Sequence, residues 1–156
     1  MLMAMTPTSD PRWFAGTLLR VLADAERTDG QLTVMEQRAP RHFSPPRHVH
    51  HREDTALVVL DGRLTVEVGD ERRVVGTGEM VWLPREVPHT FRVDSDEAHL
   101  IELATPAGIE GFHLDASDPA PSAVLPPPGQ PDISRLQAAI EPYGADIIGP
   151  PLFAAD

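Results

Sequence analysis

The residues best suited to chemistry are His48 and His50, in the segment PPRHVHH, and His89, far downstream. His48 and His50 are two residues apart, a spacing that places both side chains on one face of a β-strand. His89 follows Pro88 at the start of the strand-like segment HTFRVD. If the two strands pair, the three imidazoles could hold one divalent ion (Fe, Ni, Mn, Zn or Cu) and leave positions open for substrate or water. We therefore predict a metal site formed by these three histidines.

Two carboxylates in strand-like runs are candidate catalytic residues or supports for the metal ligands. Glu36 lies in LTVMEQR and Glu102 in LIELA, and either could face the interior. A buried acid is costly unless a cation or a metal lies beside it, so strand glutamates usually face solvent. Glu53 and Asp54 follow the histidines closely. Strand alternation turns Asp54 away from them, although a bulge could bring one of these two acids back.

The other four histidines fit a structural role better than a chemical one. His51 directly follows a predicted ligand and, by alternation, points to the opposite face of its strand, where solvent surrounds it. The other three are scattered along the chain, and we expect them at the surface or in loops: His42, His99 and His113.

Composition excludes several kinds of chemistry and of partner. The chain has 156 residues and contains no cysteine or lysine, which removes disulfides, thiolate ligands, thiol nucleophiles and Schiff-base catalysis. The net charge is −11 and there is no basic cluster, so nucleic acid and anionic membrane surfaces are poor partners. No segment resembles a membrane span or a secretory signal. We expect a cytoplasmic protein whose partner is a small-molecule substrate.

The segments that carry these residues have the features of short β-strands. Between about Gly16 and Ala107, apolar runs rich in β-branched residues alternate with Gly, Pro and Asp-Gly turns. Asp61-Gly62 separates LVVL from RLTVEV and predicts a hairpin, and VEVGDERRVV predicts another turn. The segment GTLLRVLADAE fits a strand or the start of a helix, and we favour a strand. Many short strands with frequent turns predict an all-β sandwich or barrel.

The C-terminal quarter of the chain differs in character. SDPAPSAVLPPPGQP is dense in proline and predicts an extended arm. DISRLQAAIEPYG then predicts a short helix, because Ile133, Leu136 and Ile140 lie on one face and a proline and a glycine follow to end it. We expect this helix to dock on the barrel. Residues 1–116 would then form the barrel with its N-terminal strands, and residues 117–156 the arm and helix.

These motifs resemble those of the cupins, small double-stranded β-helix (jelly-roll) proteins. The positions that match the two cupin motifs are, in chain order, His48, His50, Gly62, Gly78, Pro84 and His89. Glu86 and Val93 replace the inner glycine and the final asparagine of the second motif. The resemblance spans roughly residues 32–107 and is greatest to small bacterial cupins described as quercetin-dioxygenase-like. It implies an all-β jelly roll, with the arm and helix appended, and a homodimer that hides the edge strands.

Thr55 occupies the position at which the first cupin motif has a glutamate. In metal-binding cupins that glutamate is usually the fourth ligand, and in flavonol dioxygenases it is also assigned the role of base. The neutral hydroxyl of Thr55 is a poor ligand and cannot accept a proton at neutral pH. Three neutral imidazoles leave the ion its full charge to acidify a bound water or a substrate enol, so the metal remains predicted. Thr55 is then a candidate catalytic residue that orients substrate or water.

The resemblance implies a metal-dependent enzyme, an oxygenase that acts on an aromatic or polyketide-like molecule. Two alternatives remain: a redox-neutral cyclase or isomerase of natural-product biosynthesis, and a non-catalytic module that binds a small molecule. Loss of the motif glutamate fits a cyclase at least as well as an oxygenase. The apolar residues at alternating strand positions are candidates for the lining of the substrate pocket: Met35, Leu57, Val59, Met80, Trp82 and Phe91.

Overall fold

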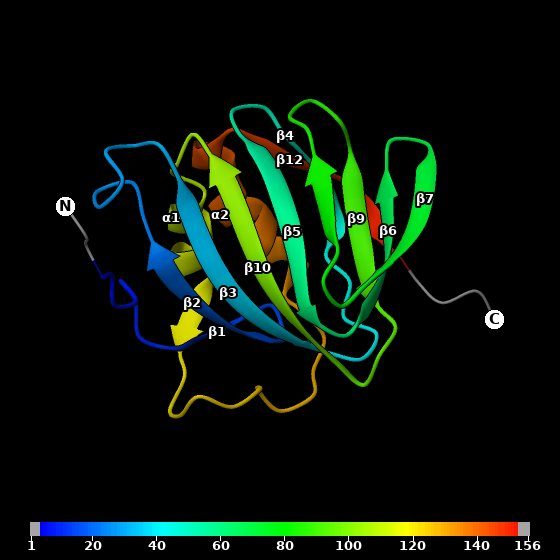
Figure 1. Ribbon diagram of the computed structural model, residues 1–156, viewed down its shortest axis with the longest axis horizontal. Coiled ribbons are helices and arrows are strands. Elements are labelled where there is room, and N and C mark those ends of the chain that lie inside the picture. Colours follow the sequence, from blue (N-terminus) through cyan, green and yellow to red (C-terminus); the bar gives the residue numbers. More distant parts are fainter. Residues whose placement is uncertain (1–3, 153–156) are drawn as a thin grey trace.

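The computed structural model describes residues 4–152, which form two antiparallel sheets that face each other (Figure 1). The described elements are β1 (Arg12–Phe14), β2 (Thr17–Ala23), β3 (Thr33–Pro40), β4 (Pro46–His50), β5 (Asp54–Asp61), β6 (Arg63–Val68), β7 (Glu71–Gly76), β8 (Met80–Leu83), β9 (His89–Val93), β10 (Glu97–Thr105), α1 (Glu110–Asp115), β11 (Ser117–Pro119), α2 (Ile133–Ile140), η1 (Glu141–Tyr143), which is a 3-10 helix, and β12 (Ala145–Pro151). One sheet has the order β11-β1-β2-β3-β10-β5-β8 and the other β12-β4-β9-β6-β7. The prediction of an all-β jelly roll with a C-terminal helix is confirmed.

Alternating burial along the strands shows which side chains face the interior. In β3, Thr33, Met35, Gln37 and Ala39 are buried, whereas the residues between them are partly exposed. This is the pattern of a strand with one covered face. The inward side chains form two apolar clusters. One lies between the two sheets, and the other lies where the N-terminal strands meet both helices.

The turn at Asp61-Gly62 exists, but the predicted hairpin is wrong. β5 lies between β10 and β8 in one sheet, and β6 lies between β9 and β7 in the other. Gly62 has a φ of +111°, and a Cβ at this position would lie 2.8 Å from the backbone oxygen of Glu97, so the corner requires glycine. The chain therefore uses this tight turn to cross between sheets. Local sequence indicates the turn but not the long-range ladder that each strand joins. The second predicted turn, at Gly69, does join the paired strands β6 and β7.

The C-terminal segment packs against the barrel through the apolar stripe of α2. Asp132 caps this helix by accepting a hydrogen bond from the backbone N–H of Arg135 at 3.0 Å. Leu136 and Ile140 are buried among residues of the N-terminal strands and of α1, while Ile133 remains 38% exposed. Figure 1 shows α2 behind the seven-stranded sheet. After α2 the chain continues through η1 into β12. No helix in the described part of the chain is long and apolar enough to cross a membrane.

The proline-rich arm runs beside the N-terminal strands. Its first residues form β11, which pairs with β1, and the remainder up to Asp132 has neither helix nor strand. The indole N–H of Trp13 donates to the carbonyl of Val124 at 2.9 Å, which ties the arm to β1. The β11, α1 and β12 elements were not predicted, because β11 and α1 are short and all three are stabilised by contacts with distant parts of the chain.

Replacement of Leu136 by alanine should lower the free energy of unfolding by about 2–5 kcal/mol, because buried methyl groups are removed and a cavity remains. The control Ile133→Ala, at the exposed N-terminal end of the same apolar stripe, should cost about 1 kcal/mol or less. Urea unfolding followed by circular dichroism measures both changes. Equally small losses would mean that α2 does not dock in solution.

Candidate metal centre

The three predicted ligands meet on two neighbouring strands of the five-stranded sheet. His48 in β4 lies directly opposite His89 in β9, and His50 is two residues further along β4. One ring nitrogen from each histidine lies within 4.8 Å of those of the other two. The ring centroids are 4.4 Å apart for His48 and His89, 5.0 Å for His48 and His50, and 5.3 Å for His50 and His89. The structure therefore gathers the imidazoles as the sequence predicts.

Hydrogen bonds fix which nitrogen each ring offers. The Nδ1 of His48 lies 2.7 Å from the carbonyl oxygen of Pro46, and that of His89 lies 3.0 Å from the carbonyl oxygen of Val87. The Nδ1 of His50 lies 2.5 Å from Oε1 of Glu53. A carbonyl or carboxylate oxygen can only accept, so each Nδ1 carries the ring proton and donates it. The three Nε2 lone pairs are thus left free for a common ligand.

Burial keeps two of these rings uncharged. The pKa of His48 is held well below its ordinary value by loss of solvation and then by repulsion from His89 and His50, against the raising effect of the bond to Pro46. Burial, with repulsion from His50, lowers the pKa of His89 to about 4. Both imidazoles are therefore neutral at pH 7. Protons do not compete with a metal for their lone pairs there.

The chemistry of this donor set fits a single divalent metal ion. Imidazole nitrogens suit Zn, Cu, Fe and Ni, and three protein ligands leave further coordination positions for a substrate or water. The hydrogen bonds from Nδ1 orient the rings and raise the basicity of the ligating nitrogens. The cluster of His48, His50 and His89 is thus compatible with one ion, whose identity the donor set leaves open among these metals.

Three residues shortly after the β4 histidines, Glu53, Asp54 and Thr55, point in different directions. Glu53 is buried, at 3% exposure, and bonds His50, because the chain bends between β4 and the start of β5. Asp54 points the other way and pairs with Arg85 at 3.0 Å. Thr55, in the position of the motif glutamate, is buried and faces the pocket from β5. A carboxylate therefore supports a ligand from behind, while a neutral hydroxyl faces the pocket.

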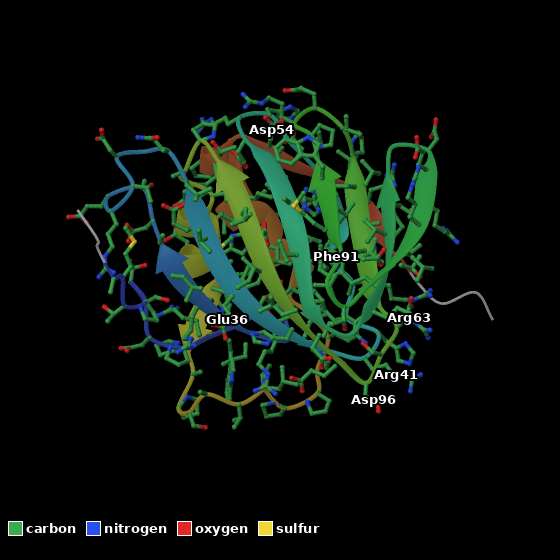
Figure 2. All side chains as sticks on the ribbon, in the orientation of Figure 1. Glu36, Arg41, Asp54, Arg63, Phe91 and Asp96 are labelled. Carbon is green, nitrogen blue, oxygen red and sulfur yellow. The ribbon has the colours of Figure 1, made fainter. Side chains whose placement is uncertain are left out.

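A largely apolar pocket opens beside the three histidines. Its apolar walls come from both sheets and from the helices: Phe14, Ala15, Phe43, Pro45, Pro46, Leu57, Leu83, Phe91, Phe112, Pro131, Leu136, Ile140 and Ile147. Figure 2 shows Phe91 near the middle of the molecule, whereas Arg41 and Asp96 lie at its periphery. The predicted C-terminal helix, α2, thus closes one side of the pocket through Leu136 and Ile140. A small apolar or aromatic molecule would be shielded from water here.

The residues predicted to line the pocket separate into three groups. Leu57 and Phe91 do line it. Met35 and Val59 face inward but lie in the apolar clusters of the core, away from the pocket. Met80 and Trp82 are 59% and 51% exposed on the outer face of β8, where their neighbours Val81 and Leu83 take the inward positions. The alternation is evident in the sequence, but the sequence does not tell which phase of a short strand faces inward.

The two predicted strand glutamates have opposite positions. Glu36 points outward from β3 and bonds Arg20 at 3.0 Å and His99 at 3.2 Å. Glu102 points inward from β10 and lines the pocket. It is not among the residues whose ligand atoms gather within 4.8 Å of one another. The structure thus separates Glu36 from the site and places Glu102 in the pocket beyond the histidine cluster.

The sequence does not indicate several of the residues that line the pocket, among them the buried polar residues His113 and Gln37. His113, expected at the surface, is 6% exposed on α1 and lines the pocket. Gln37 is buried on β3 and also lines the pocket. No motif marks either residue, although Gln37 shares the inward phase of Met35. The position of His113 depends on how α1 packs against the sheet.

Replacement of Glu53 by glutamine should weaken metal binding about tenfold, because the His50 ring loses a charged acceptor behind it. Zinc titration against a chromogenic chelator measures the affinity. The control Glu71→Gln alters the exposed pair in which Glu71 bonds Arg73 at 3.1 Å and should leave the affinity unchanged. Equal affinities for wild type and Glu53→Gln would contradict the role of Glu53.

Part of the chain matches a known domain family. Residues 34–104 match the cupin domain model. Quercetin 2,3-dioxygenase of Bacillus subtilis (strain 168) is 24% identical over 109 residues, covering 70% of this chain and 32% of that protein. The chain therefore spans only about a third of the length of this curated relative.

Solved structures agree on the fold. The polyketide cyclase RemF from Streptomyces resistomycificus matches with a TM-score of 0.55 at 22% identity, over 67% of this chain and 80% of that one. An oxalate decarboxylase of Bacillus subtilis matches with a TM-score of 0.58 at 17% identity, over 69% of this chain and 30% of that one. Likeness at these identities shows the fold alone. Combined with the domain match and the facing sheets, it establishes that the chain carries a cupin domain, whose jelly roll holds a three-histidine cluster compatible with a single metal ion.

Proposed function

We propose that the protein is a metal-dependent enzyme of the cupin type that acts on a small aromatic or polyketide-like molecule. The observation that carries this proposal is the convergence of three histidines, with their Nδ1 protons already bonded, at the wall of an apolar pocket. An apolar pocket with few polar groups is typical of a binding site for a small organic molecule. The sequence relation to quercetin 2,3-dioxygenase supports an oxygenase.

The chain's own residues supply binding, orientation and exclusion of water. When bound, a divalent ion would polarise a carbonyl, acidify an enol or phenol, or activate O2. The aromatic and aliphatic walls, completed by Leu136 and Ile140, hold a flat apolar substrate against the histidines. The hydroxyl of Thr55 can donate to or accept from a substrate oxygen or a water, but it cannot serve as a base.

A specific observation also favours a redox-neutral cyclase or isomerase as a second candidate. The carboxylate of Glu102 lies in the pocket, and no other described residue is recorded as its hydrogen-bond or ion-pair partner. A carboxylate in this position can accept a proton from an enolisable substrate, which is the step that the absent motif glutamate would otherwise perform. The structural likeness to a polyketide cyclase is consistent with this candidate.

The first test is metal content, measured by elemental analysis after incubation with Fe(II), Ni(II), Mn(II) or Zn(II). Wild type should retain near one equivalent of at least one metal, and the double variant His48→Ala/His89→Ala should retain none. His99→Ala, at an outward-facing histidine of β10, is the control and should retain as much as wild type. Metal content in wild type no higher than in the double variant would refute the proposal.

Turnover then separates the candidates. Quercetin and aromatic polyketides are incubated with the metal-loaded protein in air and without O2, and products are analysed by mass spectrometry. An oxygenase gives a product that gains oxygen only in air, whereas a cyclase or isomerase gives the same product, without added oxygen, in both atmospheres. A ligand that raises the melting temperature without turnover would identify a binding module instead.

We also propose that the protein forms a homodimer through β8. This strand ends the seven-stranded sheet, and Met80 and Trp82 on it are 59% and 51% exposed. A second copy would cover this open edge and its apolar side chains. Light scattering should show twice the chain mass for wild type and the single mass for Trp82→Glu. The control Val124→Glu, at an exposed apolar residue of the arm, should remain a dimer, and a monomeric wild type would contradict the proposal.

A further inference from the structure

The side chain of Gln37 has an orientation that its neighbours dictate. The hydroxyl of Thr17 lies 2.7 Å from the carbonyl oxygen of Phe14, which can only accept, so the hydroxyl proton is used there. Gln37 lies 2.9 Å from the same hydroxyl oxygen, which therefore accepts from the amide nitrogen of Gln37. Both Thr17 and Gln37 are buried. This arrangement turns Oε1 of Gln37, an acceptor, away from Thr17.

His113 presents a second acceptor. Its Nδ1 lies 3.0 Å from the carbonyl oxygen of Ile109 one turn earlier in the chain, so Nδ1 carries the ring proton and Nε2 is the acceptor. The ring lies 4.7 Å, centroid to centroid, from that of Phe14. Among the described residues, every fully buried side-chain nitrogen or oxygen has a hydrogen-bond partner. Nε2 of His113 has no such partner in the described part of the chain, so it is not fully buried. Nε2 therefore reaches the open space of the pocket that His113 lines.

Glu102 presents a third acceptor beside Gln37. In the ladder between β3 and β10, Gln37 lies opposite Leu100 and Glu102 lies opposite Met35, so Gln37 and Glu102 are diagonal neighbours. Both line the pocket. The Glu102 carboxylate has no recorded partner in the described chain, and an ionised carboxylate only accepts hydrogen bonds.

The three acceptors lie across the pocket from the metal ligands. Gln37 and Glu102 belong to the seven-stranded sheet and His113 to α1, whereas His48, His50 and His89 belong to the five-stranded sheet. A ligand that spans the pocket therefore meets metal-binding nitrogens at one end and acceptors at the other. Each unpaired acceptor must gain a donor from the ligand or keep water, because burial of an unpaired polar group is costly.

We propose that Gln37, Glu102 and His113 form a hydroxyl-binding subsite, separate from the metal ligands, that selects substrates with hydroxyl donors at the end remote from the metal. The substrate class is then a phenol or polyhydroxylated aromatic rather than a fully methylated or carbonyl-only one. A site of acceptors rejects a ligand without donors because its own polar groups would stay unpaired. This inference rests on the proposed function for the nature of the occupant, but none of its three residues belongs to the histidine cluster.

The test compares binding of resorcinol and of its dimethyl ether, by isothermal titration calorimetry, to full-length protein stripped of metal with EDTA. Wild type should bind resorcinol at least tenfold more tightly than the ether. His113→Phe and Glu102→Met should each reduce this preference about tenfold, the effect expected for loss of one hydrogen bond to a buried acceptor. The matched changes His99→Phe and Glu36→Met, on the outer faces of β10 and β3, should leave the preference intact.

Several results would overturn the subsite. These are equal affinity of wild type for the two ligands, no binding of resorcinol by folded wild type, or an unchanged preference in both pocket variants. Tighter binding of benzylamine than of resorcinol would show that the acceptors take a cation and would refute the hydroxyl assignment. Circular dichroism checks folding. If His113→Phe does not fold, the wild-type ligand pair and Glu102→Met decide the question. Because the protein is metal-free, failure here is distinguishable from failure of the metal-dependent function.

Discussion

The register of β4 against β9 is the constraint on which the rest of the site depends. His48 faces His89 across this ladder, and His50 follows on the same strand. On its other edge β4 pairs with β12, so that Ile147 lies opposite His48 and Ala145 opposite His50. A slip of one residue would turn both β4 imidazoles to the opposite face of the sheet. Residues near the end of the chain thus help to hold in place the histidine cluster formed by strands from its middle.

An exposed histidine reinforces this register from outside the pocket. His51 bonds Glu86 at 2.9 Å and Asp146 at 2.8 Å, and so links the end of β4 to β12 and to the loop before β9. The bonds to Asp146 and Glu86 raise the pKa of His51 above its ordinary value. Glu86 has a φ of +66°, the left-handed conformation that explains why the cupin motif has glycine at this position. Its carboxylate provides a contact that glycine could not.

The pocket combines two walls that both present lone pairs. The five-stranded sheet supplies the Nε2 lone pairs of the three histidines, because each Nδ1 donates its proton to Pro46, Val87 or Glu53. The facing sheet and α1 supply the acceptors Gln37, Glu102 and His113, and Thr55 lines the pocket from β5 of the same facing sheet. The helices close the apolar space between the walls. The residues proposed to select the substrate and those proposed to bind a metal therefore lie on different elements, which can vary independently of each other.

The sequence by itself determined the all-β class, the three candidate ligands and the apolar stripe of α2, because these depend on local periodicity and on the spacing of histidines along strands. It also indicated the tight turn at Gly62. Only the tertiary structure decided that this turn crosses between sheets, that Glu53 bonds His50, and that His113 and Glu102 enter the pocket while Trp82 stays outside. Those outcomes depend on which distant strands pair and on which phase of each strand is covered, and both are set by long-range packing rather than by the residues nearby in the chain.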